Sequence, residues 1–259
     1  MVIDERYIKD GITAAAVEKL IARHQRERER CGMLWSYYRG VQPILTREKA
    51  EGQANNRIVC NHAKYIADIA AAYIAGNAVS YSAADDTDIS AVIDEFYHQN
   101  VAMTDMEIIK GAGVCGHAYE VIYANGDAKP VSAYVDAGSA FVVYSSDLEQ
   151  KKLFGVYYFY TFDIDGTKAG SRVYVCTADE VIEFEGAAAS FSGLKETERT
   201  SHYFGAVPVI EYKNNPECTG DFEGVISLID AYNRLTSDRV NDKEQFVDSF
   251  LLLLGIDID

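Results

Sequence analysis

The chain has 259 residues, of which 48% are hydrophobic and 25% are charged, so its composition is that of a globular protein with one large domain or two modest ones. It carries 40 acidic and 24 basic residues, a formal net charge of −16, which excludes an extended basic face for nucleic acid but not a small local patch. The longest purely aliphatic run, Leu251–Leu254, is far too short to span a membrane, and the charged first ten residues do not resemble a signal peptide. We therefore expect a soluble, cytoplasmic protein.

The N-terminal third of the chain is predicted to be helical. A long helix is expected to begin at Thr13 as its cap and to end at Gly40, because apolar residues between them recur at spacings of three, four and seven. A second helix is expected from Asn61 to Gly76, followed by a short strand at Val79–Tyr81. A third apolar stripe at helical spacing begins at Ile89.

From about Gly116 the apolar period changes from 3.6 to two, which predicts strands. Asn125-Gly126 and Asp165-Gly166 are typical of tight hairpin turns. The expected strands are Tyr119–Tyr123, Val131–Val135, Phe141–Tyr144, Phe154–Phe162, Arg172–Thr177 and Glu180–Glu185. Small and polar residues predict a surface loop over Gly186–Ser201, and Pro208 predicts an edge strand at Val207–Ile210.

The C-terminal part is predicted to hold a long last helix, near Phe222–Val247, with a length of roughly 35–40 Å. Leu251–Leu254 is expected to form a strand, and nothing follows it in this chain to pair with it. The predicted fold class is α+β, with N-terminal helices, a central and mostly antiparallel sheet, and a long C-terminal helix.

One motif resembles a dinucleotide-binding loop. Gly111-Ala112-Gly113-Val114-Cys115-Gly116 matches GxGxxG, and Asp136 follows at the distance usual for the acidic partner. A dinucleotide site needs a strand before the glycines and a helix after them, so that the helix N-terminus meets the pyrophosphate. Here a helical stretch, Met103–Lys110, precedes the glycines and a strand follows. We therefore expect a helix-to-strand corner rather than a nucleotide site.

No other pattern predicts chemistry. The cysteines, at positions 31, 60, 115, 176 and 218, and the histidines, at positions 24, 62, 98, 117 and 202, show no spacing typical of a disulfide framework or a zinc site. Asp163-Ile164-Asp165-Gly166 lacks the glutamate that would close a calcium loop. The sequence therefore predicts no catalytic residue, no cofactor and no metal, and the protein is expected not to be an enzyme.

Several stretches, taken in order along nearly the whole chain, resemble a known family. They are Tyr37–Leu45, Asn56–Asp68, Tyr73–Tyr81, Gly205–Asn215, Gly220–Glu223, and Leu228–Asn233 with Ser237-Asp238 and Asn241-Asp242. Together they resemble the portal proteins of tailed bacteriophages, in the branch typical of phages of Gram-positive bacteria. The chain is shorter than portal proteins of that branch.

The resemblance implies a protomer of a ring, commonly dodecameric, at one vertex of the virion capsid, after assembly in the host cytoplasm. Such a ring nucleates capsid assembly with scaffold and major capsid proteins, docks the terminase large subunit, and later holds the head-tail connector. It lets double-stranded DNA pass during packaging and ejection, without a membrane partner. Residues 1–215 would form a wing-like domain and residues 216–259 the start of a stem-like region, in a protomer that is incomplete and assembles poorly.

Two alternatives remain open from the sequence. One is a small phage structural or adaptor protein that shares these stretches. The other is a nucleotide-binding enzyme built around Gly111–Gly116. Neighbouring genes would distinguish the first from a portal protein, and ligand titration would distinguish the second.

Overall fold

The computed structural model describes residues 1–9, 11–85, 87–187 and 190–247. Within them most helices lie in the N-terminal part, most strands in the middle and one long helix near the C-terminus, the α+β arrangement predicted. The helices are α1 Ala14–Tyr38, α2 His62–Ala75, α3 Ser90–His98, α4 Val101–Cys115 and α5 Ile226–Val247, with short 3-10 turns η1 Glu5–Ile8, η2 Pro43–Thr46 and η3 Glu223–Val225. The strands are β1 Val2–Ile3, β2 His117–Ala124, β3 Pro130–Val135, β4 Ala140–Ser145, β5 Lys152–Phe162, β6 Lys168–Cys176, β7 Glu180–Gly186, β8 Lys195–Ser201 and β9 Val209–Lys213.

The strands of this part of the chain divide between two sheets. The larger has the order β1-β4-β5-β6-β7-β8, and the smaller has the order β3-β2-β9. All neighbours are antiparallel except β1, which pairs with β4 in parallel. The mostly antiparallel strand pairing is confirmed, but the division into two sheets and the strand β1 are not evident from the sequence.

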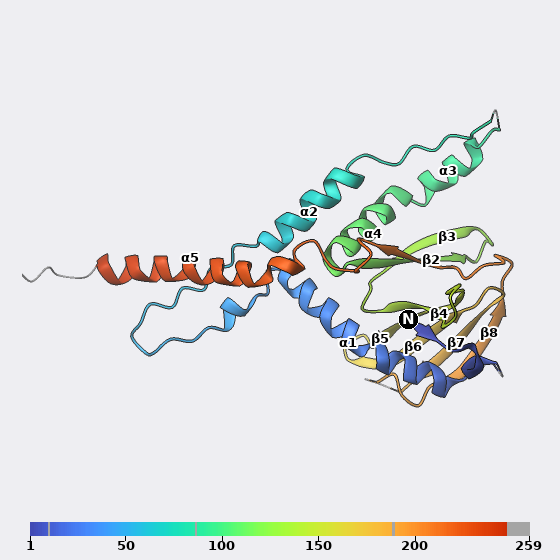
Figure 1. Cartoon of the computed structure of the whole chain (residues 1–259), viewed down its shortest axis with the longest axis horizontal. Helices are drawn as coiled ribbons and strands as arrows, with labels where there is room; N and C mark the ends of the chain where they lie inside the picture. The colour runs from blue at the N-terminus through green and yellow to red at the C-terminus, as the bar shows by residue number, and fades with distance from the viewer. Residues whose placement is uncertain (10, 86, 188–189, 248–259) are drawn as a thin grey trace, which may run out of the picture.

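Helix α1 packs against both sheets' cores along its length (Figure 1). Its first half buries Val17, Leu20 and Ile21 against strands of the larger sheet. Its second half buries Cys31 and Leu34 in a cluster that includes α2, α4 and β2. The apolar spacing in the sequence therefore marks one continuous face that two different cores share.

Both predicted helix caps are confirmed. Thr13 Oγ1 accepts a hydrogen bond from Ala16 N at 3.3 Å, and Asn61 Oδ1 accepts one from Lys64 N at 3.2 Å. Gly40, just after α1, has φ +79°, the left-handed conformation that glycine adopts readily.

Three predicted elements need correction. Val79–Tyr81 is not a strand, since no strand edge pairs with it in the described structure. The expected loop Gly186–Ser201 contains β8, which pairs with the edge of β7. Every β8 residue is exposed, so no alternating apolar pattern was needed, and charged residues cover this open edge. The edge strand β9 starts at Val209, after Pro208.

The C-terminal prediction is confirmed in part. Helix α5 is described as far as Val247 and projects away from the two sheets (Figure 1). It starts at Ile226, because Glu223–Val225 winds as a 3-10 turn. The predicted strand Leu251–Leu254 lies outside the described residues.

Candidate functional site

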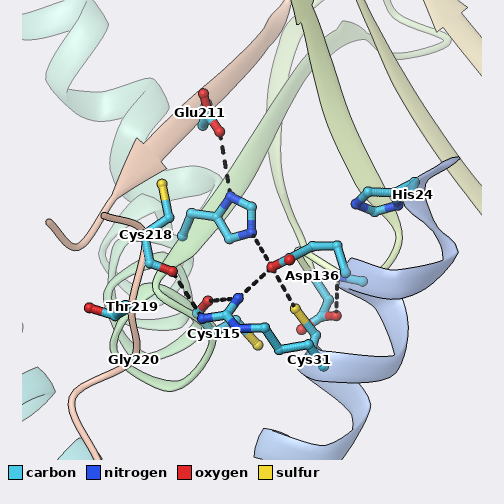
Figure 2. A network of polar contacts seen from close by, with 12 residues as sticks. His24, Cys31, Cys115, Asp136, Glu211, Cys218, Thr219 and Gly220 are labelled. Atoms are coloured by element: carbon cyan, nitrogen blue, oxygen red, sulfur yellow. Dashed lines mark hydrogen bonds and ion pairs between the residues drawn. The ribbon is translucent and has the colours of Figure 1, made fainter. Parts of the chain in front are cut away.

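A polar network lies where the second half of α1 meets the corner between α4 and β2 (Figure 2). Glu27, Arg30 and Cys31 occupy one face of α1, because residues three and four apart are neighbours on a helix. Gly116 ends α4 with φ +84°, and the next residue, His117, begins β2 with its ring nitrogen Nε2 in contact with Glu27 of α1. Strand β9 and the loop that follows it complete the site.

Arg30 joins α1 to the loop before α5. Its Nε donates to Glu223 Oε1 at 2.7 Å, and its two terminal nitrogens donate to the backbone carbonyls of Cys115 and Cys218 at 3.1 and 3.0 Å. It also pairs with Glu27. The hydrogen bond from Arg30 holds the pKa of Glu223 below its usual value. One guanidinium thus satisfies acceptors from three separate segments.

His117 lies between two carboxylates. Its Nε2 is 3.1 Å from Glu27 Oε1, and its Nδ1 is 3.4 Å from Glu211 Oε1. Burial alone lowers the pKa of His117, but contacts with Cys31, Glu211 and Glu27 outweigh burial and raise the pKa to about 11. The hydrogen bond with His117 is the main cause that lowers the pKa of Glu27 to about 2. The site therefore concentrates charge in a place that is mostly closed to water.

Glu211 is held in turn by two tyrosines. The Tyr144 hydroxyl donates to Glu211 Oε2 at 2.9 Å, and the Tyr119 hydroxyl donates to Oε1 at 3.2 Å. Burial raises the pKa of Glu211, but the hydrogen bonds from His117 and Tyr144 outweigh it and lower the pKa to about 2. Glu211 thus orients the far side of the His117 ring.

Two thiols complete the network. Cys31 and Cys115 are buried, and their side chains contact each other. Cys31 Sγ is 3.7 Å from Glu27 Oε1. Among the described residues, one oxygen of Glu27, the sulfur of Cys31 and one nitrogen of His117 lie within 4.8 Å of one another. Sequence spacing missed this group because α1 and β2 lie far apart in the chain.

Helix α5 has its polar side buried. Asn233, Ser237 and Asn241, at spacings of four, are at most 1% exposed. They accept hydrogen bonds from the backbone nitrogens of Cys60 at 2.8 Å, Ile58 at 3.0 Å and Asn56 at 2.7 Å, respectively. The backbone nitrogen of every second residue in the extended segment 56–60 thus donates to a side chain that recurs every four residues on α5. The four-residue spacing of these small polar residues is visible in the sequence and is the pattern that could have indicated a buried polar stripe.

The exposed side of α2 is largely apolar, and that of α5 carries apolar residues among charged ones. On α2, Tyr65, Ile69 and Tyr73 follow one stripe and are 66%, 56% and 92% exposed. On α5, Leu228 and Leu235 are 67% and 58% exposed. Large apolar side chains exposed along one stripe, as on α2, are more common at contact surfaces than elsewhere.

The glycine motif serves packing. Gly111 and Gly113 lie inside α4, where a Cβ would come within 2.5 Å of the Tyr134 hydroxyl and 2.7 Å of an Asp221 carboxylate oxygen. The predicted helix-to-strand corner is confirmed at Gly116. No helix N-terminus follows the glycines, so the arrangement that a dinucleotide needs is not present in this segment.

The other motifs form turns and ion pairs. Asp163–Gly166 is the turn between β5 and β6. On α5, Asp238 pairs with Arg47 and Lys49 at 3.0 Å each. In the part of the chain that the structure describes, no helix is both long and apolar enough to cross a lipid bilayer.

Comparison with known proteins gives one family. The family described as "Phage portal protein, SPP1 Gp6-like" matches residues 17–258. No curated protein matches the chain in sequence.

Proposed function

Because the chain belongs to the SPP1 Gp6-like family of phage portal proteins, we propose that it is a ring-forming protomer at the capsid vertex. The ring would serve as the conduit for double-stranded DNA during packaging and ejection. It would also be the docking platform for the terminase large subunit, the scaffold and major capsid proteins, and the head-tail connector. The family match over residues 17–258 carries this proposal.

The outer surfaces of α2 and α5 support a ring. On α5, the apolar side chains of Leu228 and Leu235 are exposed, and on α2 so are those of Ile69 and Tyr73. Large apolar side chains left in water have an unfavourable hydration free energy that a protein contact would remove. A neighbouring protomer in a ring would cover these side chains, since cyclic assemblies join two different surfaces of identical chains.

The charge of the chain supports a conduit. Phosphate contacts from lysine and arginine produce tight, salt-dependent binding to DNA. A net charge of −16 disfavours such binding, and DNA that must pass through a ring should not be held by it. The role proposed is structural, with no covalent chemistry.

Two finer assignments belong to the same proposal. We assign residues 1–215 to a wing-like domain and residues 216–259 to the start of a stem-like region. The support is the direction of α5, which leaves the body of the molecule (Figure 1). We also assign the protein to the branch of phages of Gram-positive bacteria, on the sequence stretches that resemble that branch.

Light scattering coupled to size-exclusion chromatography, with negative-stain electron microscopy of the same fractions, tests the ring. The expected result is closed rings of uniform size, either from this chain or from this chain extended at its C-terminus. A protein that stays monomeric in both forms would favour the alternative of a small adaptor protein.

A pair of variants tests whether α2 forms the contact. Ile69→Asp combined with Tyr73→Asp should abolish assembly, because two charges would enter an apolar interface. The matched control is Ile164→Asp, at a fully exposed turn between β5 and β6, which should leave assembly unchanged. If both proteins assemble equally, the α2 surface is not the ring contact.

A further inference from the structure

We propose that Glu27, Cys31 and His117 form a binding site for one zinc ion. These residues come from α1 and from the first position of β2, and each offers one ligand atom. The proposal stands on the geometry of this cluster and does not depend on the portal assignment.

The distances between the ligand atoms suit a tetrahedral metal. Glu27 Oε1 lies 3.1 Å from His117 Nε2 and 3.7 Å from Cys31 Sγ. All three atoms lie within 4.8 Å of one another. Zinc bonds of about 2.0–2.3 Å to oxygen, nitrogen and sulfur place neighbouring ligand atoms about 3.3–3.6 Å apart. A single ion can therefore reach all three atoms with small side-chain movements.

The donor atoms select the metal. A thiolate and an imidazole favour zinc over magnesium or calcium, which prefer oxygen ligands. The group offers three protein ligands, so a fourth position remains for water. Cys115 lies beside Cys31 but outside the group of three, and we do not count it as a ligand.

Surrounding residues hold the ligands in place. A metal-bound histidine usually directs its other ring nitrogen at a carboxylate, which fixes the ring orientation. Glu211 has this place at His117 Nδ1, and Tyr144 and Tyr119 anchor Glu211. Arg30 Nη1 donates to Glu27 Oε1, the ligand oxygen itself, at 2.5 Å and so restricts its position, while a second lone pair of that oxygen is left for the metal.

The charge around the site also favours a cation. Glu27 and Glu223 pair with Arg30, and Glu27 and Glu211 lie against His117, so with His117 neutral as a ligand three carboxylates would oppose a single guanidinium. Zinc would release the protons of the Cys31 thiol and of His117 Nε2 to solvent and would take their place between the ligands. It would tie α1 to the corner between α4 and β2.

Metal analysis of the full chain tests the proposal. The reduced protein, freed of metal with a chelator and then titrated with zinc in competition with a chromophoric chelator, should bind about one ion per chain. Cobalt, used as a probe, should give the near-ultraviolet absorption of a thiolate–cobalt bond. Cys31→Ser should remove that absorption, and both Cys31→Ser and His117→Gln should weaken zinc binding at least tenfold.

Controls distinguish a site from adventitious binding. Cys60→Ser and His62→Gln change the same residue types outside the cluster and should bind zinc like the wild type. Zinc should raise the melting temperature of the wild type and not of Cys31→Ser, whose far-ultraviolet circular dichroism reports whether it folds. Equal zinc affinity in the wild type and in a folded Cys31→Ser would overturn the proposal and leave the cluster as an ion-pair network alone.

Discussion

Gly116 shows how one residue shapes the polar network. It combines φ +84° with a close approach, since a Cβ at this position would lie 2.0 Å from the carbonyl oxygen of Cys218. Its own backbone nitrogen donates to Ala112 O at 2.7 Å, and its carbonyl accepts from Asn214 N at 2.9 Å. The turn that delivers His117 to α1 therefore needs both the conformation and the small size of glycine.

We predict that Gly116→Ala destabilises the protein by at least about 3 kcal/mol, from backbone strain together with the clash. The matched control is Gly166→Ala, where φ is +80° and no atom lies within 4 Å of the added Cβ. It should cost only about 1 kcal/mol, the price of the conformation alone. Urea unfolding measures both values, and equal losses would contradict the role of close packing.

His24 is a buried histidine with an unpaired nitrogen. Its Nδ1 lies 2.7 Å from the Tyr158 hydroxyl, its ring lies against Phe141, and its Nε2 has no hydrogen-bond partner among the described residues. Burial is the main cause that lowers the pKa of His24 to about 4. His24 therefore stays neutral in the folded protein at pH values below 6.5, where it takes up a proton in the unfolded protein.

Since the pKa is lower in the folded state, stability from neutral His24 is present at pH 7 and is lost as the pH falls below about 6.5. We predict that the difference in unfolding free energy between the wild type and His24→Gln changes by about 1.5–2 kcal/mol between pH 7 and pH 5. His117 contributes to both proteins and cancels in this difference. Denaturant unfolding at several pH values measures it, and a difference that does not vary with pH would refute the prediction.

At the scale of elements, a four-residue repeat on α5 matches in length a two-residue repeat of the extended segment 56–60 that precedes α2. Four residues of a helix rise about 6.0 Å, and two residues of an extended chain advance about 6.6 Å. Asn233, Ser237 and Asn241 can therefore each meet one backbone nitrogen of the segment at residues 56–60. The segment gains hydrogen bonds like those of a sheet edge without a partner strand.

We predict that Asn233→Ala lowers the unfolding free energy by about 2–4 kcal/mol, because it leaves buried groups unpaired. Asn233 accepts from Cys60 N and donates to Gln42, and it is 0% exposed. Arg234→Ala, at the next and exposed position of α5, should change stability by less than about 0.5 kcal/mol. Thermal or urea unfolding of the two variants measures these changes in unfolding free energy. Similarly small losses in both would show that the hydrogen bonds between α5 and residues 56–60 contribute little to stability.

At the scale of the whole molecule, the net charge of −16 governs the response to DNA. We predict no retained complex with linear duplex DNA at about 0.15 M salt, where few phosphate contacts can form and screening weakens them. Fluorescence anisotropy with labelled duplex measures this. A dissociation constant below about 1 µM at that salt concentration would contradict both the charge argument and a channel that does not hold DNA.

The sequence by itself determined the local elements: helix caps at Thr13 and Asn61, hairpin turns, the glycine corner, the long last helix and the α+β class. These depend on short-range hydrogen bonds and on the periodicity of side chains, which a linear pattern records. It failed at β8, because an exposed edge strand needs no apolar alternation.

Only the tertiary structure decided which residues meet. The group of Glu27, Cys31 and His117, the Arg30 contacts and the inward polar side of α5 all join segments that are distant in the chain. Helix α5 is amphipathic in sequence, but the pattern does not say which side is buried. That depends on what packs against each side, and here the backbone nitrogens of residues 56–60 pair with Asn233, Ser237 and Asn241, which buries this polar stripe.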